Sequence, residues 1–405
     1  MRLGSSASLI FRGHPTECQR DDLPKNLSGS GAGARDVRLD ALRGLFLVIM
    51  AAVHVPTPLS HLLQEPFGFT SAAEGFVFLG ACLAGYVYGK TFAKSGWAAM
   101  SRRVWGRAKV VYVMHVGLVM PMALLAYAAG SRVAGLANQF HDFLQHPWAS
   151  LALMPLLLHQ PPLFDILPLY VVLLAATPLV MRAARRAGWT PILCLSAILW
   201  LAAQFKLDAR LLGDPARWLP VRWGSFNFLA WQFLWIAGLA TGETTLRHPI
   251  IARRYRGVMG MSAGAIVLAG LLARHGLWPN AWFSPDLFLW MDKWTLGPLR
   301  ILNFGAWGVF LLAWNPRPPA IFAPLALLGR HSLAVFTFHI PLVIAATLLL
   351  DACHPPAAAQ IVLGFFVIAL LFPWAAWQEW PPAGPAPAPE SAPAPMPAAM
   401  AGQGI

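Results

Sequence analysis

The chain has 405 residues, of which 57% are hydrophobic and 12% are charged, and its formal net charge is +13 at pH 7. A mean hydropathy of +0.56 and repeated apolar runs of about 20 residues exclude an ordinary soluble protein and predict an all-α polytopic membrane protein. The basic residues lie in short clusters between these runs, without a basic face that carries interleaved aromatics, which excludes a nucleic-acid partner. The lipid bilayer is therefore the expected surrounding.

The two ends of the chain differ in composition from its middle. Residues 1–34 are polar and rich in serine and glycine, and they lack the apolar region of a signal peptide, which predicts a disordered cytoplasmic tail. Residues 380–405 form a Pro/Ala-rich low-complexity stretch, which predicts a second disordered tail. The predicted membrane domain therefore covers residues 35–379.

About ten apolar segments of this domain are predicted to cross the membrane. They are residues 43–63, 70–90, 107–129, 164–182, 189–206, 225–243, 257–274, 298–314, 322–350 and 357–378. Lysine and arginine clusters precede the first segment and follow the second, fourth, sixth and eighth, so all of them fall on one side. The positive-inside rule makes that side cytoplasmic, and it places both termini there.

One apolar stretch does not fit this count. The stretch SLALMPLLLHQPPLFD, residues 150–165, is short and interrupted by proline. If it crossed the membrane, every later basic cluster would move to the outer side. We therefore expect an interfacial or re-entrant segment on the periplasmic side.

The first segment carries the pattern Asp-x-x-Arg-x10-His, formed by Asp40, Arg43 and His54. Three helical turns are about 11 residues, so Arg43 and His54 share a helix face, about 16 Å apart along the axis. Arg43 is suited to hold an anionic group from the cytoplasm, and His54 to take a proton from an acceptor hydroxyl. The alternatives are a topology-setting cation and a core histidine. Pro56 and Pro58 predict a kink just beyond His54.

Two further ionisable residues inside apolar segments are candidates for the same site. Glu74, near the start of the second segment, is predicted to hydrogen-bond the second ring nitrogen of His54 and fix its tautomer. The alternative is a structural contact between the first two segments. His339, in the ninth segment, lies about as deep as His54 and either lines the same cavity or packs as a core histidine. The four cysteines form no CxxC motif or close pair, so no metal site is expected.

Charged residues at the segment ends are candidates for substrate binding. Arg103 and Arg107 are four residues apart on one helix face, where they either bind the phosphates of a coenzyme or anchor the topology. Lys293, Arg300 and Asn303 stand where the eighth segment enters from outside. They either receive an anionic or sugar acceptor or form the charged rim of an outer loop.

These residues carry a resemblance to a known family. RLDALRGLFLVIMAAVH is similar to the first span of the acyltransferase type three superfamily, whose members share an Arg-x10-His pattern there. The blocks PFGFTSAAEGFVFLGACLAGYVYG, ILPLYVVLLAATPLV, FNFLAWQFLWIAG, KWTLGPLRILNF and LGRHSLAVFTFH follow it in order. Together, between about residues 38 and 340, they resemble the OpgC family.

The resemblance implies a ten-span acyltransferase of the bacterial inner membrane that succinylates osmoregulated periplasmic glucans. The acyl group would come from cytoplasmic acyl-coenzyme A, with succinyl-coenzyme A as the family-level expectation. Its Arg-x10-His pair corresponds here to Arg43 and His54, and its basic motif at the third span to Arg103 and Arg107, although the spacing there differs. His54 is then either a general base or an acyl carrier.

Two other classes stay open on the sequence. A transporter also needs polar residues at mid-membrane, although it would usually show repeated halves, which this sequence lacks. A non-catalytic partner of a glycan synthase would need no histidine chemistry at all.

Overall fold

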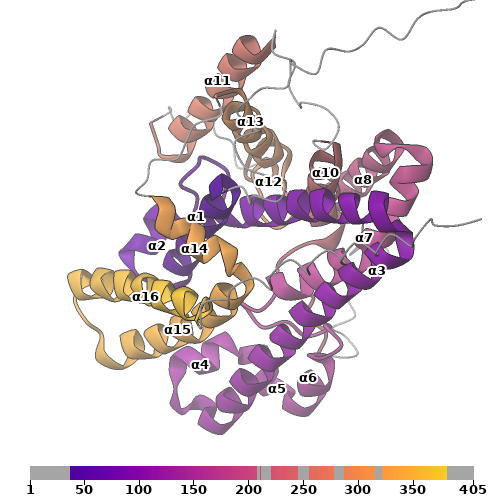
Figure 1. Ribbon diagram of the computed structural model, residues 1–405. Coiled ribbons are helices and arrows are strands. Elements are labelled where there is room, and N and C mark those ends of the chain that lie inside the picture. The colour runs from indigo at the N-terminus through magenta and orange to yellow at the C-terminus, as the bar shows by residue number, and fades with distance from the viewer. Residues whose placement is uncertain are drawn as a thin grey trace, which may run out of the picture. The chain divides into compact units, whose positions relative to one another are not determined.

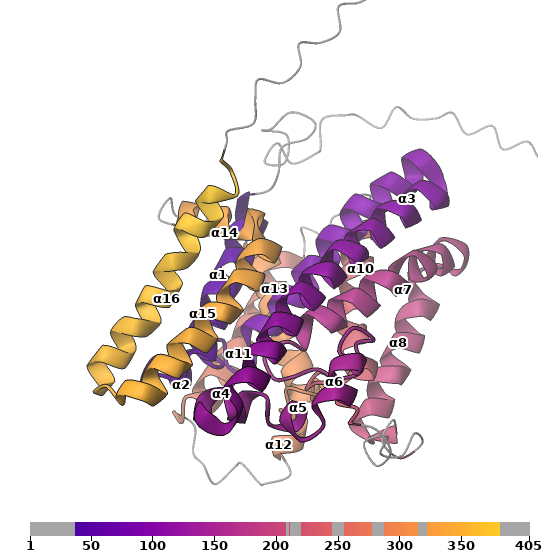
Figure 2. The ribbon, with the colours of Figure 1, turned by 90° about the horizontal axis from the view of Figure 1, so that it is seen from below.

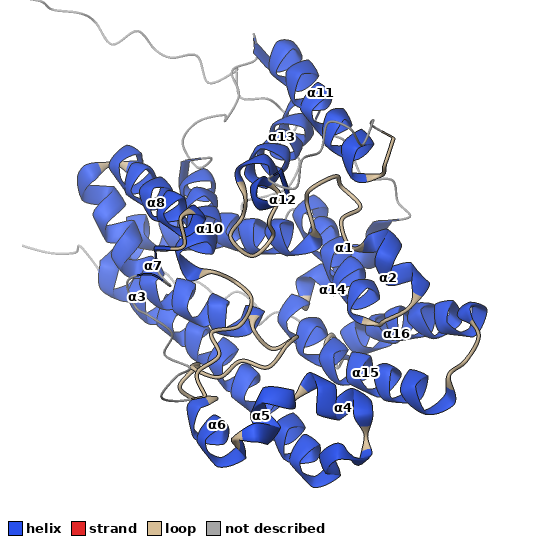
Figure 3. Ribbon diagram, turned by 180° about the vertical axis from the view of Figure 1, so that it is seen from behind, coloured by secondary structure: helices blue, strands red, loops and turns tan. Residues whose placement is uncertain are grey.

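The computed structural model describes residues 37–207, 210, 220–244, 255–277, 287–314 and 322–380, which belong to the unit Val37–Ile405. Every regular element in these residues is a helix (Figures 1 and 3), and one isolated bridge pairs His159 with Arg222. The predicted all-α class is therefore confirmed. The two predicted tails lie outside the described residues, apart from Trp380.

Five of the described helices are long and apolar enough to cross a membrane. They are α3 (Ala72–Ala129), α7 (Ile166–Ala187), α11 (Arg256–Arg274), α15 (Ser332–Cys353) and α16 (Ala357–Trp377). Shorter apolar helices add to these, namely α8 (Trp189–Gln204), α10 (Phe228–Thr244) and α13 (Pro298–Trp314). A membrane protein is supported, whereas the number of ten spans and the cytoplasmic position of both termini stay predictions.

The first predicted segment, residues 43–63, contains two helices rather than one continuous helix. Helix α1 (Val37–His54) ends at the histidine, and a separate short helix, α2 (Pro58–Leu63), follows it. The break lies where the kink was predicted. Pro56 disfavours helical geometry at Val55 and lacks an N–H group, while Pro58 fits the first turn of the new helix. His54 is thereby left at the end of α1, beside irregular backbone.

The second and third predicted segments are joined in α3. Its start is fixed by a capping box, in which Ser71 and Glu74 satisfy each other's backbone N–H groups. Gly96 has a positive φ of 76°, which kinks α3 between its two apolar halves. Figure 1 shows the ribbon of α3 turning back on itself at its kinked end, as two successive predicted segments require.

The ninth predicted segment is divided. Helix α14 (Ala323–Arg330) ends at His331, and α15 begins at Ser332. The non-helical geometry at His331 separates the two helices. Ser332 and His339 lie two turns apart on α15, and so project from one face of it.

Residues 154–165, between α6 (Pro147–Leu153) and α7, form irregular backbone rather than a span, as predicted. The short helices α2, α4 (Ala134–Gln139), α5 (His141–Gln145), α6 and α12 (Leu287–Trp290) gather at one end of the helices (Figure 2). The kinked end of α3 lies at the opposite end. The short helices and the kink of α3 thus lie at opposite ends of the described long helices.

Helices α1 and α14 approach each other closely at two glycines. A Cβ atom on Gly44 would overlap the backbone carbonyl of Leu325, and one on Gly329 would overlap the carbonyl of Asp40. Only residues without a side chain allow backbones to meet in this way. The contact fixes α1, and with it Arg43, against the helix that precedes Ser332.

We expect Gly44→Ala to destabilise the protein by about 1–3 kcal/mol, because the added methyl group must push two backbones apart. Thermal unfolding of the detergent-solubilised protein measures this as a lower melting temperature. Gly117→Ala in α3 is the matched control, because its Cβ would meet nothing within 4 Å and alanine favours the helix. Equal melting temperatures for the two variants would contradict the close α1–α14 contact.

Candidate functional site

The side chains of Arg43 in α1 and Ser332 in α15 are in direct contact. The guanidinium Nη2 of Arg43 donates a hydrogen bond to the Ser332 hydroxyl, and the guanidinium carbon lies 6.0 Å from the centre of the Phe76 ring. Ser332 and Phe76 are buried, and Arg43 is half-buried. A cation is thus fixed against an apolar wall by residues from three helices.

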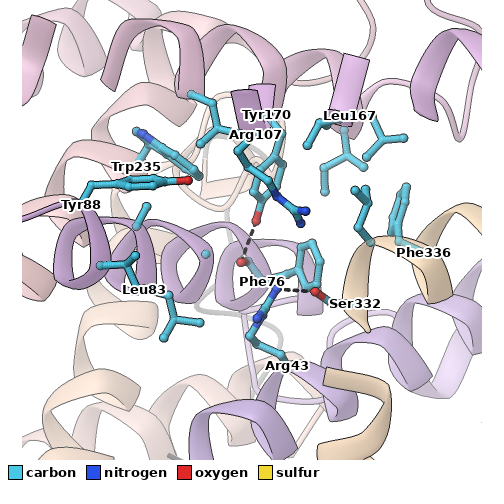
Figure 4. A pocket seen from close by; sticks show the side chains of 17 residues that line it. Arg43, Phe76, Leu83, Tyr88, Arg107, Leu167, Tyr170, Trp235, Ser332 and Phe336 are labelled. Carbon is cyan, nitrogen blue, oxygen red and sulfur yellow. Dashed lines mark hydrogen bonds between the residues drawn. The ribbon is translucent and has the colours of Figure 1, made fainter. Parts of the chain in front are cut away.

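The side chain of Arg43 lines a cavity of about 220 Å³ (Figure 4). Its walls come from α1, α3, α7, α10 and α15. The lining residues are Arg43, Phe76, Gly80, Leu83, Ala84, Val87, Tyr88, Arg107, Val111, Ile166, Leu167, Tyr170, Leu174, Trp235, Ser332, Leu333 and Phe336. Figure 4 shows Arg43 and Arg107 reaching into the same space from different helices. The cavity thus brings together an arginine from the first predicted segment and one from the third.

The cavity combines positive charge with apolar and phenolic walls. Tyr170 donates to the carbonyl of Phe76 at 2.8 Å, which fixes one wall. Arg43 and Arg107 both act electrostatically on Tyr170, while Arg103 and Arg107 act on Tyr88. Such a site suits a ligand with anionic groups and an apolar portion.

Arg103 and Arg107 have different environments. Arg107 is exposed and lines the cavity, whereas Arg103 donates to the Thr91 hydroxyl at 3.3 Å and is not among the lining residues. The structure therefore brings Arg107 to the cavity and leaves Arg103 beside it.

His54 and His339 form a direct pair. The Nδ1 of His54 lies 3.1 Å from the Nε2 of His339, and the rings stack at a centroid distance of 5.3 Å with 17° between their planes. His339 is almost fully buried, and His54 is half-buried. The two histidines are therefore direct neighbours, although neither of them lines the cavity that contains Arg43.

The hydrogen bonds fix the tautomers of this pair. The Nδ1 of His339 contacts the carbonyl oxygen of Phe336, which only accepts, so this nitrogen carries the proton. In a neutral His339 the Nε2 is then an acceptor, so the Nδ1 of His54 must donate to it. The Nε2 of a neutral His54 is left with a free lone pair, which is what a general base or a nucleophile requires.

Phe336 separates the histidine pair from the cavity. Its ring lines the cavity and lies 6.3 Å from Phe76, stacked at 26°. The same ring meets His339 at 4.7 Å. The cavity and the pair are thus neighbours along α1 and α15, with one aromatic ring between them.

Glu74 does not make the predicted hydrogen bond with His54. It is fully buried, its Oε2 accepts from the backbone N–H of Ser71 at 3.0 Å, and its Oε1 accepts from Arg300 at 2.7 Å. The place beside His54 that was predicted for Glu74 is taken by His339. The physical reason is that the capping box holds this carboxylate at the start of α3.

Arg300 and Asn303 are buried in contacts within the protein. Arg300 pairs with both Glu65 and Glu74, and Glu65 also pairs with Arg274. The Oδ1 of Asn303 accepts from the backbone N–H of Phe69 at 3.1 Å and from the Thr70 hydroxyl at 3.0 Å. The indole N–H of Trp307 also donates a hydrogen bond to the carbonyl of Phe67 at 2.9 Å. These residues hold the loop before α3 rather than opening onto the cavity lined by Arg43.

Sequence reasoning missed Ser332, Tyr170 and Phe336. Ser332 had a readable signal, because it lies two helical turns before His339, just as Arg43 lies three turns before His54. Tyr170 and Phe336 are ordinary apolar-helix residues in the sequence, and only the packing of five helices assigns them to the cavity.

A charged contact lies next to Ser332 in the chain. Arg330 and His331 contact the Glu379 carboxylate at 2.9 and 3.2 Å, beyond the end of α16. The hydrogen bonds from Arg330 and His331 hold the pKa of this exposed carboxyl below its usual range. The junction of α14 and α15 is thereby tied to the last described helix.

Comparison with known proteins gives one result. No curated protein and no solved structure matches the chain. The family model described as OpgC protein matches residues 35–382, which covers the whole of the predicted membrane domain. The resemblance carried by the sequence blocks is thus confirmed, and the chain belongs to the OpgC protein family.

Proposed function

We propose that this protein is a membrane acyltransferase of the bacterial inner membrane, which moves a succinyl group from cytoplasmic succinyl-coenzyme A to a hydroxyl of a periplasmic glucan. Membership of the OpgC family supports the reaction class. One structural observation carries the rest. Helices α1 and α15 place a cavity that contains Arg43 and Ser332 in line with the His54–His339 pair.

The donor enters from the arginine end. Coenzyme A carries phosphates, and Arg43 and Arg107 offer them two guanidinium groups in one cavity. Arg103 adds positive charge near Tyr88. The flexible arm of the coenzyme then has to pass Phe336, so that the thioester reaches His54. Movement of the Phe336 ring away from His339 is the step that joins the two compartments.

The reaction proceeds through His54 as general base. The glucan hydroxyl loses its proton to the Nε2 of His54 as its oxygen attacks the thioester carbonyl carbon. The tetrahedral intermediate collapses with cleavage of the carbon–sulfur bond, and the thiolate takes the proton from His54. His339 accepts the Nδ1–H of His54 throughout and stabilises the imidazolium that forms between the two steps.

The test is mass spectrometry of periplasmic glucans from cells that lack the protein, complemented with wild type, with His54→Ala or with an empty vector. The proposal expects glucan masses raised by whole succinyl groups with wild type alone. Unchanged glucans in every strain would refute the acceptor. Full succinylation by His54→Ala at equal abundance would instead fit a transporter or a non-catalytic partner of a glucan synthase.

Arg107→Gln is expected to raise the KM for succinyl-coenzyme A roughly tenfold, because one charged hydrogen bond to a phosphate is lost, with little change in kcat. Initial rates at varied donor concentration, with protein in lipid nanodiscs, measure this. Arg102→Gln is the matched control, since Arg102 is an exposed neighbour on α3 that does not line the cavity. Equal KM values for the two variants would contradict the proposal that the donor binds in this cavity.

A further inference from the structure

The kinked end of α3 and the last turns of α7 carry a strongly basic surface (Figure 2). Residues 86–110 and 175–190 contain lysines and arginines but no aspartate or glutamate. All of these cations are exposed, and they are Lys90, Lys94, Arg102, Arg103, Arg107, Lys109, Arg182, Arg185 and Arg186. Glu243 of α10 pairs with Arg185 at 2.6 Å and neutralises one of the charges. Most of the positive charge therefore has no counter-ion among the residues that the structure describes.

Two tryptophans of α3 are fixed on α7 beside this charge. The indole N–H of Trp97 donates to the carbonyl of Pro178 at 3.4 Å, and that of Trp105 donates to the carbonyl of Ala175 at 3.2 Å. The two rings meet edge to face, with centroids 6.3 Å apart. Trp97 is half-buried, and Trp105 is 46% exposed. Exposed indoles whose N–H groups are already bonded are typical of the boundary between lipid headgroups and acyl chains.

Arg182 lies against this tryptophan pair, and its charge is not used by the protein. Its guanidinium carbon is 4.8 Å from the centre of the Trp97 ring. In the described part of the chain the guanidinium forms no hydrogen bond and no ion pair. A guanidinium that packs on an aromatic ring keeps N–H groups free to bind an anion. Arg182 is therefore held in position while its donors stay available to a ligand.

The exposed face of α7 before Arg182 is apolar. Arg182 ends a stripe of exposed residues spaced three or four apart, which share one face of the helix and are Val172, Ala175 and Leu179. Val172 is 42% exposed and Leu179 is 62% exposed. On α3, Lys109 stands one turn after Trp105 on the same face, where its long stem can lie on apolar surface while its ammonium group reaches the headgroup level. Cations at the end of an exposed apolar face match the shape of a phospholipid.

The surface therefore favours a lipid over a soluble anion. A soluble anion would use the cations alone, whereas a phospholipid also covers the exposed indole of Trp105 and the stripe that contains Leu179. Arg182 and Lys109 do not line the cavity that contains Arg43, so this surface is separate from the proposed donor site. The combination of uncompensated charge and apolar surface selects an anionic lipid in particular.

We propose that the surface formed by Trp97, Trp105, Lys109 and Arg182 binds the headgroup of an anionic phospholipid. The phosphate contacts the guanidinium of Arg182 and the ammonium group of Lys109, and the acyl chains follow the apolar stripe of α7. The site lies at the end of the helices that is predicted to be cytoplasmic. It does not depend on the proposed acyltransferase function, because it involves no residue of the cavity or of the histidine pair.

Native mass spectrometry of the detergent-solubilised protein tests this by titration with two lipids of equal chain length, anionic dioleoylphosphatidylglycerol and zwitterionic dioleoylphosphatidylcholine. We expect Arg182→Gln to raise the dissociation constant for phosphatidylglycerol roughly fivefold, and the double variant with Lys109→Gln to raise it about 25-fold, one step per cation. Arg256→Gln, at an exposed arginine at the start of α11, is the matched control and leaves the constant unchanged. Equal constants for wild type and Arg182→Gln, or equal affinities for the two lipids, overturn the proposal.

Thermal unfolding supplies a second readout. Without lipid, Arg182→Gln should melt at the wild-type temperature, because Arg182 is exposed. Phosphatidylglycerol should then raise the melting temperature of wild type more than that of Arg182→Gln, because a ligand stabilises the folded state to which it binds. The same rise in both proteins overturns the proposal.

Coenzyme A distinguishes this surface from the donor cavity. We expect coenzyme A to leave the lipid-bound fraction of wild type unchanged, because Arg182 and Lys109 lie outside the cavity lined by Arg43. Displacement of phosphatidylglycerol by coenzyme A would assign the surface to the donor and overturn the lipid proposal. None of these measurements needs turnover, so a failure of acyl transfer does not affect them.

Discussion

Replacement of His54 with alanine is expected to lower kcat for acyl transfer by about 10²–10⁴-fold, the usual contribution of a positioned general base. In the proposed binding mode the affinity for the donor changes little, because Arg43 and Arg107 would hold the phosphates on the other side of Phe336. The hydrogen bonds of the pair leave the Nε2 of His54 as the free lone pair at this centre. Initial rates and calorimetric donor binding, measured on one preparation, separate the two effects.

His339→Leu is the companion variant, because it removes the acceptor of the His54 Nδ1–H with a side chain of apolar character. One lost hydrogen bond to an imidazolium lowers the rate by about 10–100-fold. His339 acts through His54, so the double variant should be no slower than His54→Ala alone. Losses that multiply in the double variant would show that His339 works independently. Wild-type rates in His54→Ala would reduce His54 to a packing residue.

The position of Arg43 and His54 on one face of α1 could be predicted from their spacing alone. Arg43 and His54 are three helical turns apart, so no tertiary information is needed to place them on one face. The break after His54 was also readable, because Pro56 and Pro58 restrict the backbone wherever they occur. Both features depend only on neighbours within the same helix.

Contacts between helices that are distant in the sequence could not be predicted in the same way. Glu74 has an equally plausible partner in His54 and in Arg300, and which one it meets depends on how α1 and α13 pack around α3. Glu74 and Arg300 are 226 residues apart in the chain, so no local rule connects them. The exact ends of the helices could not be predicted from the sequence for a related reason. His331 divides an apolar run whose hydropathy alone predicts one continuous span.

Loss of Arg300 is expected to cost the protein about 3–5 kcal/mol, the penalty for leaving buried charge without its partner. Arg300→Met removes the shared cation between Glu65 and Glu74, and Glu74 has no exposure to water. Thermal unfolding of detergent-solubilised protein should show a large fall in melting temperature. Arg186→Met, at an exposed arginine near the end of α7, is the control and should leave it unchanged.

The double variant Glu74→Gln with Arg300→Met decides what kind of residue Arg300 is. Neutralising the stranded carboxylate should recover part of the lost stability, because most of the penalty belongs to the unpaired charge rather than to the missing arginine. Activity per folded molecule should then stay close to that of wild type. If Arg300→Met instead keeps the melting temperature and raises the KM for the glucan, Arg300 binds the acceptor, as its place at the outer entry first suggested. Buried pairing with two carboxylates favours the structural outcome, because a guanidinium engaged on both sides has few donors left for a sugar.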